Sequence, residues 1–196
     1  RLPRKDALAK AIGEAVYTTD IRLPRMLYGK TLRSPHPHAR ILDIDTSRAE
    51  RLPGVKGVIT WKDIGDDKKR FFYGAIQPDE YPFAVDKVRF IGDEVAAVAA
   101  VDEECAREAL GLIDVSYDPL PAVFDPEEAM KPGAPQLHEH AEGNISWRLY
   151  QDLGDVEEGF RQADHIREDR FVTGFQCHVP LEPHAAVAQV NADGSL

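Results

Sequence analysis

The sequence predicts an α+β fold in which a compact α/β unit is followed by the beginning of a second mixed α/β domain. Three observations predict it. Extended and helical patterns alternate through residues 1–125, a connector rich in proline and glycine occupies residues 126–144, and new helical and extended patterns follow in residues 145–196. A chain of 196 residues is long enough to bury a substantial core.

The first part of the chain predicts two strands, a short helix and a third strand. The run ILDID at residues 41–45 alternates apolar and polar side chains, as a half-buried strand does. The run TSRAERL predicts the helix: Thr46 or Ser47 can cap it, and Glu50 lies three residues after Ser47, as in a capping box. Pro53–Gly54 ends the helix, and GVKGVIT then returns to strand character.

A polar connection over residues 62–82 leads to a second strand and helix unit, and its length predicts a path over the surface. The run DKVRFIGDEVAAVAAV predicts two strands around Gly92, of which the second is almost wholly apolar, as in a buried strand. DEECAREALGLI predicts a helix capped by Asp102. The side chains expected on its inward face are those of Cys105, Ala106, Ala109, Leu110 and Ile113. An extended segment stiffened by Pro119 and Pro121 follows.

The connector begins with a short helical pattern. Glu127 and Glu128 follow Asp125–Pro126, and acidic side chains are stabilised at the positive end of a helix dipole. Its few large apolar residues otherwise predict a surface path between two domains.

The last part of the chain predicts a helix and two strands. Asp155 can cap the helix, with Val156, Phe160 and Ala163 expected to face inward, and a strand is expected to continue through Phe171. AAVAQV predicts a further strand, and NADGSL predicts a hairpin turn.

Composition argues against two classes of partner. The formal charge of -10 at pH 7 opposes binding to phosphate backbones, so no nucleic-acid partner is expected. No apolar run approaches the roughly 20 residues that span a bilayer, so no membrane segment is expected. The N-terminal residues lack the apolar stretch of a secretory signal, and only two cysteines occur, Cys105 and Cys177. A reducing, cytoplasmic location is therefore expected.

The stretch TGFQCHVPLEPHAAVAQV mixes polar and metal-ligating side chains with apolar ones. A zinc site could use Cys177, His178 and His184, but their spacing matches no standard structural set and a fourth ligand is not evident. Gln176 could instead contact a cofactor through its amide, or be an ordinary hydrogen-bonded residue of a strand. For Glu182 a structural hydrogen bond is expected.

The motif SPHPHARI places two histidines on one face of an extended segment. His36 and His38 could form a metal pair, but the neighbouring prolines favour a rigid strand entry. We expect the two histidines to pack and to form hydrogen bonds.

Two long segments carry a resemblance to a known family. LRSPHPHARILDIDTSRAERLPGVKGVIT, taken with DKVRFIGDEVAAVAAVDEECAREALGLIDVSYDPLPAVFDPEEA, closely resembles the large molybdopterin-binding subunit of the xanthine oxidase family of molybdenum hydroxylases. Residues 1–125 look like its α/β hammerhead domain. GDVEEGFRQADHIREDRF and FQCHVPLEPHA look like the opening of its molybdopterin-binding domain, which residues 145–196 would begin.

The resemblance implies a role for three consecutive residues. In the family a glutamine of this stretch approaches the apical oxo ligand of molybdenum, and Gln176 occupies its place. Gly174 and Phe175 would lie beside the pterin, although the family often has glycine where this chain has Phe175. No catalytic residue and no metal ligand is expected, because the family's glutamate base and its GGFGGK-like loop both lie well downstream of this stretch.

The resemblance also implies the cofactors and partners. The cofactor would be molybdenum-molybdopterin, with the cytosine dinucleotide form left open, and residues outside this sequence would bind most of it. Two cysteines cannot ligate an iron-sulfur cluster, so the clusters and FAD would belong to partner domains or subunits. The expected partners are the remainder of the molybdopterin subunit, an iron-sulfur subunit, an FAD subunit and a small-molecule substrate.

The expected function is part of a molybdenum-dependent hydroxylase or dehydrogenase that is inactive alone. The run YGAIQPDEYPFAVDKVRF is somewhat similar to the hydroxybenzoyl-CoA reductase branch, but xanthine, aldehydes, N-heterocycles and carbon monoxide all remain open as substrates. The alternative is a non-catalytic assembly module that docks other subunits.

Overall fold

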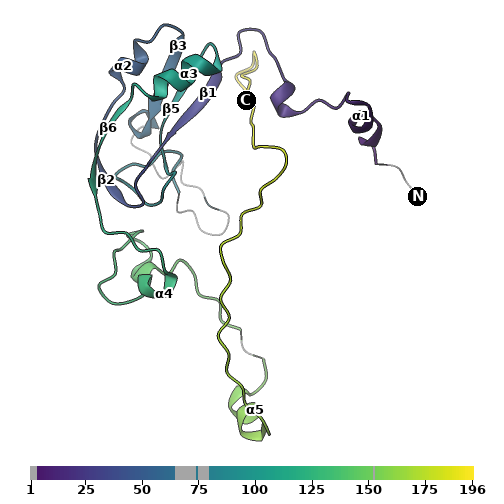
Figure 1. The fold of residues 1–196 in the computed structure, drawn as a ribbon, viewed down its shortest axis with the longest axis vertical. Coiled ribbons are helices and arrows are strands. Elements are labelled where there is room, and N and C mark those ends of the chain that lie inside the picture. The colour runs from purple at the N-terminus through teal and green to yellow at the C-terminus, as the bar shows by residue number, and fades with distance from the viewer. Residues whose placement is uncertain (1–3, 65–73, 75–79, 152) are drawn as a thin grey trace. The chain divides into compact units, whose positions relative to one another are not determined.

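The computed structural model describes residues 4–64, 74, 80–151 and 153–196. It comprises two units: Arg25–Tyr150 forms one, and Arg1–Pro24 with Gln151–Leu196 forms the other (Figure 1). Most of the connection predicted over residues 62–82 lies outside the described residues, as does most of the run YGAIQPDEYP.

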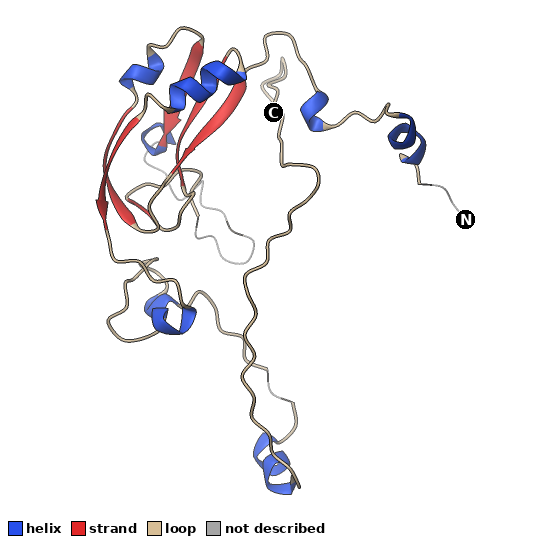
Figure 2. Cartoon of the chain, in the orientation of Figure 1, coloured by secondary structure: helices blue, strands red, loops and turns tan. Residues whose placement is uncertain are grey.

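The Arg25–Tyr150 unit contains two three-stranded antiparallel sheets (Figure 2). In the first, the order is β1 (Tyr28–Arg33), β5 (Glu94–Ala100) and β3 (Val55–Thr60). The central strand is the apolar run EVAAVAA, and it pairs with β1 from Tyr28 opposite Ala100 and with β3 from Val55 opposite Ala100. β5 is paired on both edges, so it is the central strand of the sheet. Its apolar run is typical of a strand whose side chains are buried.

The second sheet has the order β4 (Lys87–Val88), β2 (Ala39–Asp45) and β6 (Asp114–Pro119). In it Ala39 lies opposite Val88 on one side and opposite Pro119 on the other. The strands predicted around Gly92 and over ILDID are therefore confirmed.

Side-chain caps explain where α3 and α4 begin. The carboxylate of Asp102 accepts a hydrogen bond from the Cys105 amide at 2.8 Å at the start of α3 (Glu103–Leu110). Asp125 does the same at α4 (Pro126–Ala129), where it accepts from Glu127 and Glu128 amides, both at 2.9 Å. These predicted helix starts are confirmed, because short acidic side chains satisfy the amides that a first turn leaves unpaired.

The predicted cap of α2 (Ser47–Glu50) is wrong in detail. The Thr46 hydroxyl donates to the Glu50 carboxylate instead of accepting from an amide, and Asp45 accepts the Ser47 amide at 2.9 Å. A carboxylate at the end of β2 can reach the first helical amide, which leaves Thr46 free to donate.

The core lies between the sheets and helix α3 and is built largely from small side chains. Ala106 and Ala109 of α3 are fully buried, and Ile113, Cys105 and Leu110 pack with them, which confirms the predicted inward face. Gly54 has φ of +103°, and a Cβ built on it would lie 2.8 Å from Cys105 Sγ. Only glycine fits where the turn after α2 meets α3 so closely.

The other unit contains little regular structure. Its helices are α1 (Ala7–Ile12), the 3₁₀ helix η1 (Thr18–Asp20) and α5 (Val156–Gln162), which starts as predicted, with Asp155 accepting the Glu158 amide at 2.9 Å. The hairpin turn is also present, since the Gly194 amide donates to Asn191 O at 3.0 Å.

Two strands predicted for this unit are not formed. Residues 163–172 and 185–190 adopt neither helix nor strand, and Phe171 is 87% exposed. Val156 and Phe160, expected to face inward, are each more than half exposed. A strand needs a neighbour for its backbone groups, and no partner strand is present in the described part of this unit.

Candidate functional site

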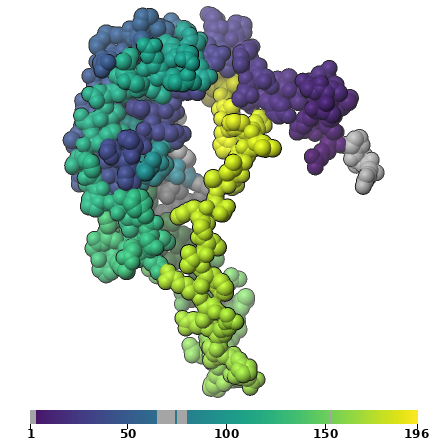
Figure 3. All heavy atoms as spheres, viewed as in Figure 1, coloured from purple at the N-terminus to yellow at the C-terminus, as the bar shows by residue number. Residues whose placement is uncertain are grey.

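The three residues expected to contact a cofactor lie together in the unit that holds α5. Gly174, Phe175 and Gln176 belong to a segment without helix or strand, in which every side chain from Phe171 to His184 is exposed. In the space-filling view this part of the chain is a narrow column of atoms (Figure 3). A Cβ built on Gly174 would meet nothing within 4 Å, and the side chain of Gln176 is exposed.

The structure does not assemble the alternative zinc site. Cys177, His178 and His184 are exposed along the same segment, and no group of three or more metal-ligating residues forms in the part of the chain that the structure describes. Glu182 is exposed as well, and among the described residues its side chain shows no structural hydrogen bond.

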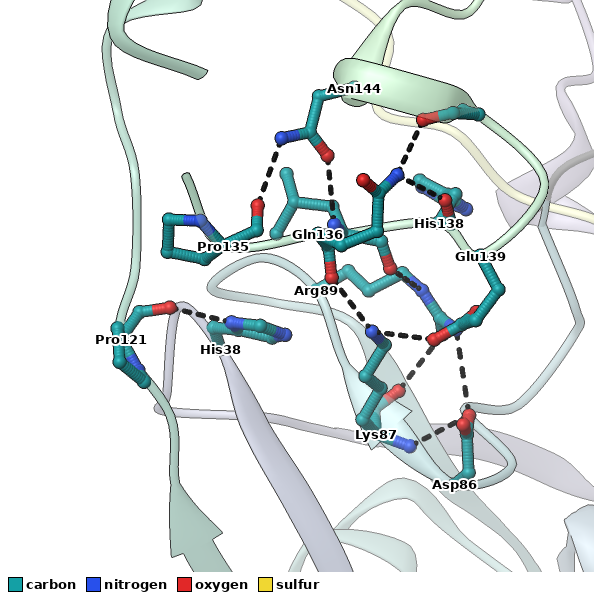
Figure 4. Close-up of polar contacts among 12 residues, drawn as sticks. His38, Asp86, Lys87, Arg89, Pro121, Pro135, Gln136, His138, Glu139 and Asn144 are labelled. Carbon is teal, nitrogen blue, oxygen red and sulfur yellow. Dashed lines mark hydrogen bonds and ion pairs between the residues drawn. The ribbon is translucent and has the colours of Figure 1, made fainter. Parts of the chain in front are cut away.

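The histidine pair of SPHPHARI is structural, as expected. His38 is 4% exposed, and its Nδ1 lies 2.7 Å from the carbonyl oxygen of Pro121 (Figure 4). His36 packs edge-on against Tyr117 with 4.8 Å between ring centroids. The hydrogen bond of His38 joins the start of β2 to the extended segment after β6.

A network of charges fastens the connector to strand β4, and sequence reasoning missed it. Lys87 is 8% exposed, and its ammonium group lies 2.8 Å from Glu139 and donates to the carbonyl oxygen of Gln136 at 3.0 Å (Figure 4). Arg89, just after β4, donates to Leu137 O at 2.9 Å and lies 3.3 Å from Glu139. Two cations at β4 therefore share one carboxylate of the connector.

This network also sets the ionisation of Glu139. Partial burial raises the pKa of the carboxyl, but hydrogen bonds from Lys87 and from the backbone, with the charges of Lys87 and Arg89, outweigh it and lower the pKa to about 2. Glu139 is therefore ionised at neutral pH and stays paired with Lys87.

Asn144 closes the connector on itself. Its side-chain amide donates to the carbonyl oxygens of Ala129 and Pro135, each at 2.9 Å, and its side-chain oxygen accepts the Leu137 amide at 2.9 Å (Figure 4). One side chain thus uses both its donors and its acceptor to hold three backbone groups.

A groove of about 540 Å³ lies beside this network, and its wall includes His38, Arg40, Lys87 and Pro135. The alternation of Lys87 and Arg89 places two cations on one face of an extended run, but it does not indicate which carboxylate they bind. The carboxylate they bind lies about fifty residues further on, a distance over which sequence patterns predict no pairing. The network holds the backbone of the connector and pairs two cations with one carboxylate. The described residues around it include no nucleophile paired with a base.

None of the helices in the described ranges is both long and apolar enough to cross a membrane.

Comparison with protein families gives two matches that together cover most of the chain. Residues 12–121 match the model of the aldehyde oxidase and xanthine dehydrogenase a/b hammerhead domain. Residues 137–196 match the model of the molybdopterin cofactor-binding domain. The first match alone exceeds half of the chain.

Known proteins agree. The chain is 42% identical over 193 residues to a probable xanthine dehydrogenase subunit of Bacillus subtilis (strain 168), covering 98% of this chain and 25% of that protein. It is 37% identical to the nicotinate dehydrogenase large molybdopterin subunit of Eubacterium barkeri, covering 97% of this chain and 44% of that protein. Both relatives are named as subunits, and this chain spans less than half of either.

A solved structure supports the same assignment. The Cu,Mo-CO dehydrogenase in its carbon monoxide reduced state superimposes with a TM-score of 0.66 at 38% identity, covering 76% of this chain and 18% of that one. The predicted α+β hammerhead fold and the predicted resemblance are thus confirmed. The chain belongs to the aldehyde oxidase and xanthine dehydrogenase family, in which it corresponds to the hammerhead domain and part of the molybdopterin cofactor-binding domain of the large subunit.

Proposed function

We propose that this chain is the part of a molybdenum-dependent oxidoreductase large subunit that supplies scaffold and one cofactor-contacting glutamine, Gln176. The observation that carries the proposal is the pair of family matches, since Gln176 falls inside the residues matched to the cofactor-binding domain. The division into a hammerhead domain (1–125), a connector (126–144) and the start of the cofactor-binding domain (145–196) is part of the proposal.

The residues present suit a contact to the molybdenum-molybdopterin cofactor. When bound, that group supplies the redox centre of the reaction. Gln176 offers an exposed side-chain amide, which can donate a hydrogen bond to an oxo oxygen without adding charge. The open space around Gly174 lets a planar ring system approach the backbone, and the fully exposed ring of Phe175 can form an apolar wall beside it.

The rest of the assembly follows from the same assignment. Residues outside this sequence would bind most of the cofactor, including any cytosine dinucleotide extension, and would supply the base and the substrate pocket. Iron-sulfur and FAD partners would carry electrons away, because Cys105 and Cys177 are too few for a cluster. The substrate is a small molecule and the location is the cytoplasm.

The test is Gln176→Ala and Gln176→Glu in the complete enzyme complex. Loss of a hydrogen-bond partner next to a metal group commonly lowers activity or metal affinity by roughly 10- to 100-fold, and we expect a loss of this size for Gln176→Ala. Gln176→Glu should be worse, because an ionised carboxylate cannot donate and adds negative charge toward the oxo oxygen. The measurements are molybdenum content and turnover per bound molybdenum.

Gln189→Ala is the matched control, since Gln189 is also exposed on the same stretch and should change neither quantity. Full metal content with wild-type turnover in both Gln176 variants would show that Gln176 is an ordinary residue. If the purified complex carries no molybdenum at all, the chain is a non-catalytic assembly module.

A further inference from the structure

One buried polar atom in the described part of the chain has no partner. It is Nε2 of His38, which exposes less than 1 Å². The other ring nitrogen, Nδ1, faces the Pro121 carbonyl oxygen at 2.7 Å, and a carbonyl oxygen can only accept. Nδ1 therefore carries the hydrogen, and Nε2 of the neutral ring is a lone-pair acceptor that requires a donor.

An orphaned acceptor of this kind calls for an explanation, since buried polar groups in native proteins are nearly always paired. Figure 4 shows Nε2 directed away from Pro121, toward the side on which Lys87 and Gln136 lie. Neither donates to Nε2 as placed: the Lys87 ammonium group directs two of its three hydrogens to Glu139 and to the Gln136 carbonyl oxygen and forms no hydrogen bond with His38. The Gln136 side-chain amide donates to His138 and Ala141 carbonyl oxygens.

The groove beside His38 also contains an unpaired charge. Arg40 is exposed on β2, and within the described ranges its guanidinium group makes no hydrogen bond or ion pair. The other charges of the groove are matched, since Lys87 pairs with Glu139, and Asp86 lies 3.5 Å from Arg89. The rim adds apolar surface from Leu120, Pro121 and Pro135. Among the described residues, two groups of the groove are therefore without a partner: Nε2 of His38, which could accept a hydrogen bond, and the guanidinium group of Arg40, which could bind an anion.

We propose that this groove is the docking site for an extended segment from the remaining part of the large subunit. The segment presents an N–H or O–H donor to His38 Nε2 and a carboxylate to Arg40. The inference rests on the proposed function, because it takes the chain to be one part of a longer subunit. This chain covers 25% of the length of the Bacillus subtilis relative, and the proposal takes its occupant from the corresponding remainder of the subunit.

A segment suits the site better than a small molecule does. The groove is open and lies along the surface, whereas small-molecule sites bury most of their ligand in an enclosed cleft. Nε2 exposes less than 1 Å², so a donor reaches it only when residues around the groove shift as the segment binds. A segment lying along the groove wall, which includes Gly133, Pro135 and Gln136 of the connector, provides enough contact to hold that shift.

The first experiment places the photo-crosslinking residue p-benzoylphenylalanine at position 120, where Leu120 lines the groove, in the full-length large subunit of the assembled complex, so that His38 and Arg40 stay intact. The expected product is a crosslink to a peptide of the same subunit outside residues 1–196, identified by mass spectrometry. The same residue at Lys56, exposed on β3, is the control and should not capture that peptide. A crosslink to another subunit, or none at position 120, overturns the proposal.

The second experiment follows hydrogen exchange of residues 133–139 in the same complex. Arg40→Glu should speed their exchange at least about tenfold through repulsion of the docked carboxylate, and Arg40→Gln less so. His38→Gln can still place an acceptor near the Nε2 position, whereas His38→Asn reaches only the position of Nδ1, so His38→Asn should be the faster of the two. Equal exchange in wild type and Arg40→Glu shows that only solvent or a small solute fills the groove.

The two proposals fail separately. Normal molybdenum content and turnover without the crosslink leave the proposed function intact and remove the docking segment. The crosslink in a complex that lacks molybdenum supports the docking segment and contradicts the proposed function.

Discussion

The Arg25–Tyr150 unit and residues 151–196 have similar sequence patterns and different outcomes. In the first, an apolar strand such as β5 finds a neighbour on each edge, and its Val95, Ala96 and Val98 side chains are at most 1% exposed. In the second, Phe171 and Val172 carry a comparable strand pattern and are more than 80% exposed. The difference teaches that β character in a sequence becomes a strand only where a neighbouring strand is available to pair with it.

The two regions also differ in how their polar groups are held. Connector residues 136–144 are held by Lys87, Arg89 and Asn144 through contacts that span up to 52 residues of sequence. Side-chain contacts seen within residues 151–196 are between near neighbours, such as Asp155 with the Glu158 amide. Non-local side-chain contacts therefore distinguish the connector from residues 151–196.

The largest effect on stability is expected when a buried valine is replaced by aspartate, compared with the same replacement of an exposed valine. Val98→Asp should reduce the free energy of unfolding by about 4 kcal/mol or more, because it buries an unpaired charge at a site that is 1% exposed. Val172→Asp, at a site 81% exposed, should change it by less than about 0.5 kcal/mol. Urea unfolding followed by the fluorescence of Trp61 and Trp147 measures both, and equal effects would erase the distinction between the regions.

A glycine in each region gives the next contrast. Gly54→Ala should destabilise the chain by about 2 kcal/mol, since φ is +103° and the new methyl group would lie 2.8 Å from Cys105 Sγ. Gly174→Ala should have almost no effect on unfolding, because nothing lies within 4 Å of its added Cβ. Thermal unfolding monitored by circular dichroism compares them. A Gly54→Ala melt at the wild-type temperature would mean that the turn and α3 can separate without loss of stability.

Removing the shared carboxylate of the connector should have a smaller effect with a pH signature. Glu139→Gln should cost about 1 kcal/mol, a value reduced because the Glu139 side chain is 67% exposed. The pKa of Glu139 falls from 4.5 to about 2 on folding, so its contribution is present above pH 4.5 and is lost as pH falls toward 2. The difference in unfolding free energy between wild type and variant, measured from pH 7 to 2, should shrink accordingly.

Glu142→Gln, at an exposed site of the same connector, is the control for this change. A wild-type advantage that persists undiminished at pH 2 would show that the side chain acts through packing and not through its charge.

The smallest effect on stability is expected at Asp93, where the substitution should stabilise the chain and not destabilise it. Burial raises the pKa of Asp93 above 3.8, against the lowering effects of the Arg89 amide hydrogen bond and the Arg89 charge. Stability is therefore lost as pH rises from 3.8 through the folded-state pKa, and Asp93→Asn should stabilise the chain by less than about 1 kcal/mol at pH 7. Its amide oxygen can still accept from the Arg89 amide, which Asp93 does at 2.9 Å. Asp118→Asn, at an exposed site, serves as the reference, and a destabilised Asp93→Asn would refute the sign.

Local chemistry by itself determined the starts of α3, α4 and α5. Asp102, Asp125 and Asp155 each cap the helix that the sequence predicts, because a short carboxylate satisfies the first amides without help from distant residues. The family resemblance could also be predicted from the sequence, because SPHPHARI and the runs around it are continuous segments of the chain. The role of Gln176 stays a prediction.

Tertiary structure alone decided which patterns became structure and which polar groups met. The apolar run of β5 became the centre of a sheet because β1 and β3 close on it from elsewhere in the chain, while the strands predicted near Phe171 and over AAVAQV found no such closure. Lys87 and Glu139 lie on segments whose pairing depends on how the intervening strand and helix pack. Pairing at that separation is fixed by the whole fold, so neither the network nor the unpaired nitrogen of His38 could be predicted from spacing or composition.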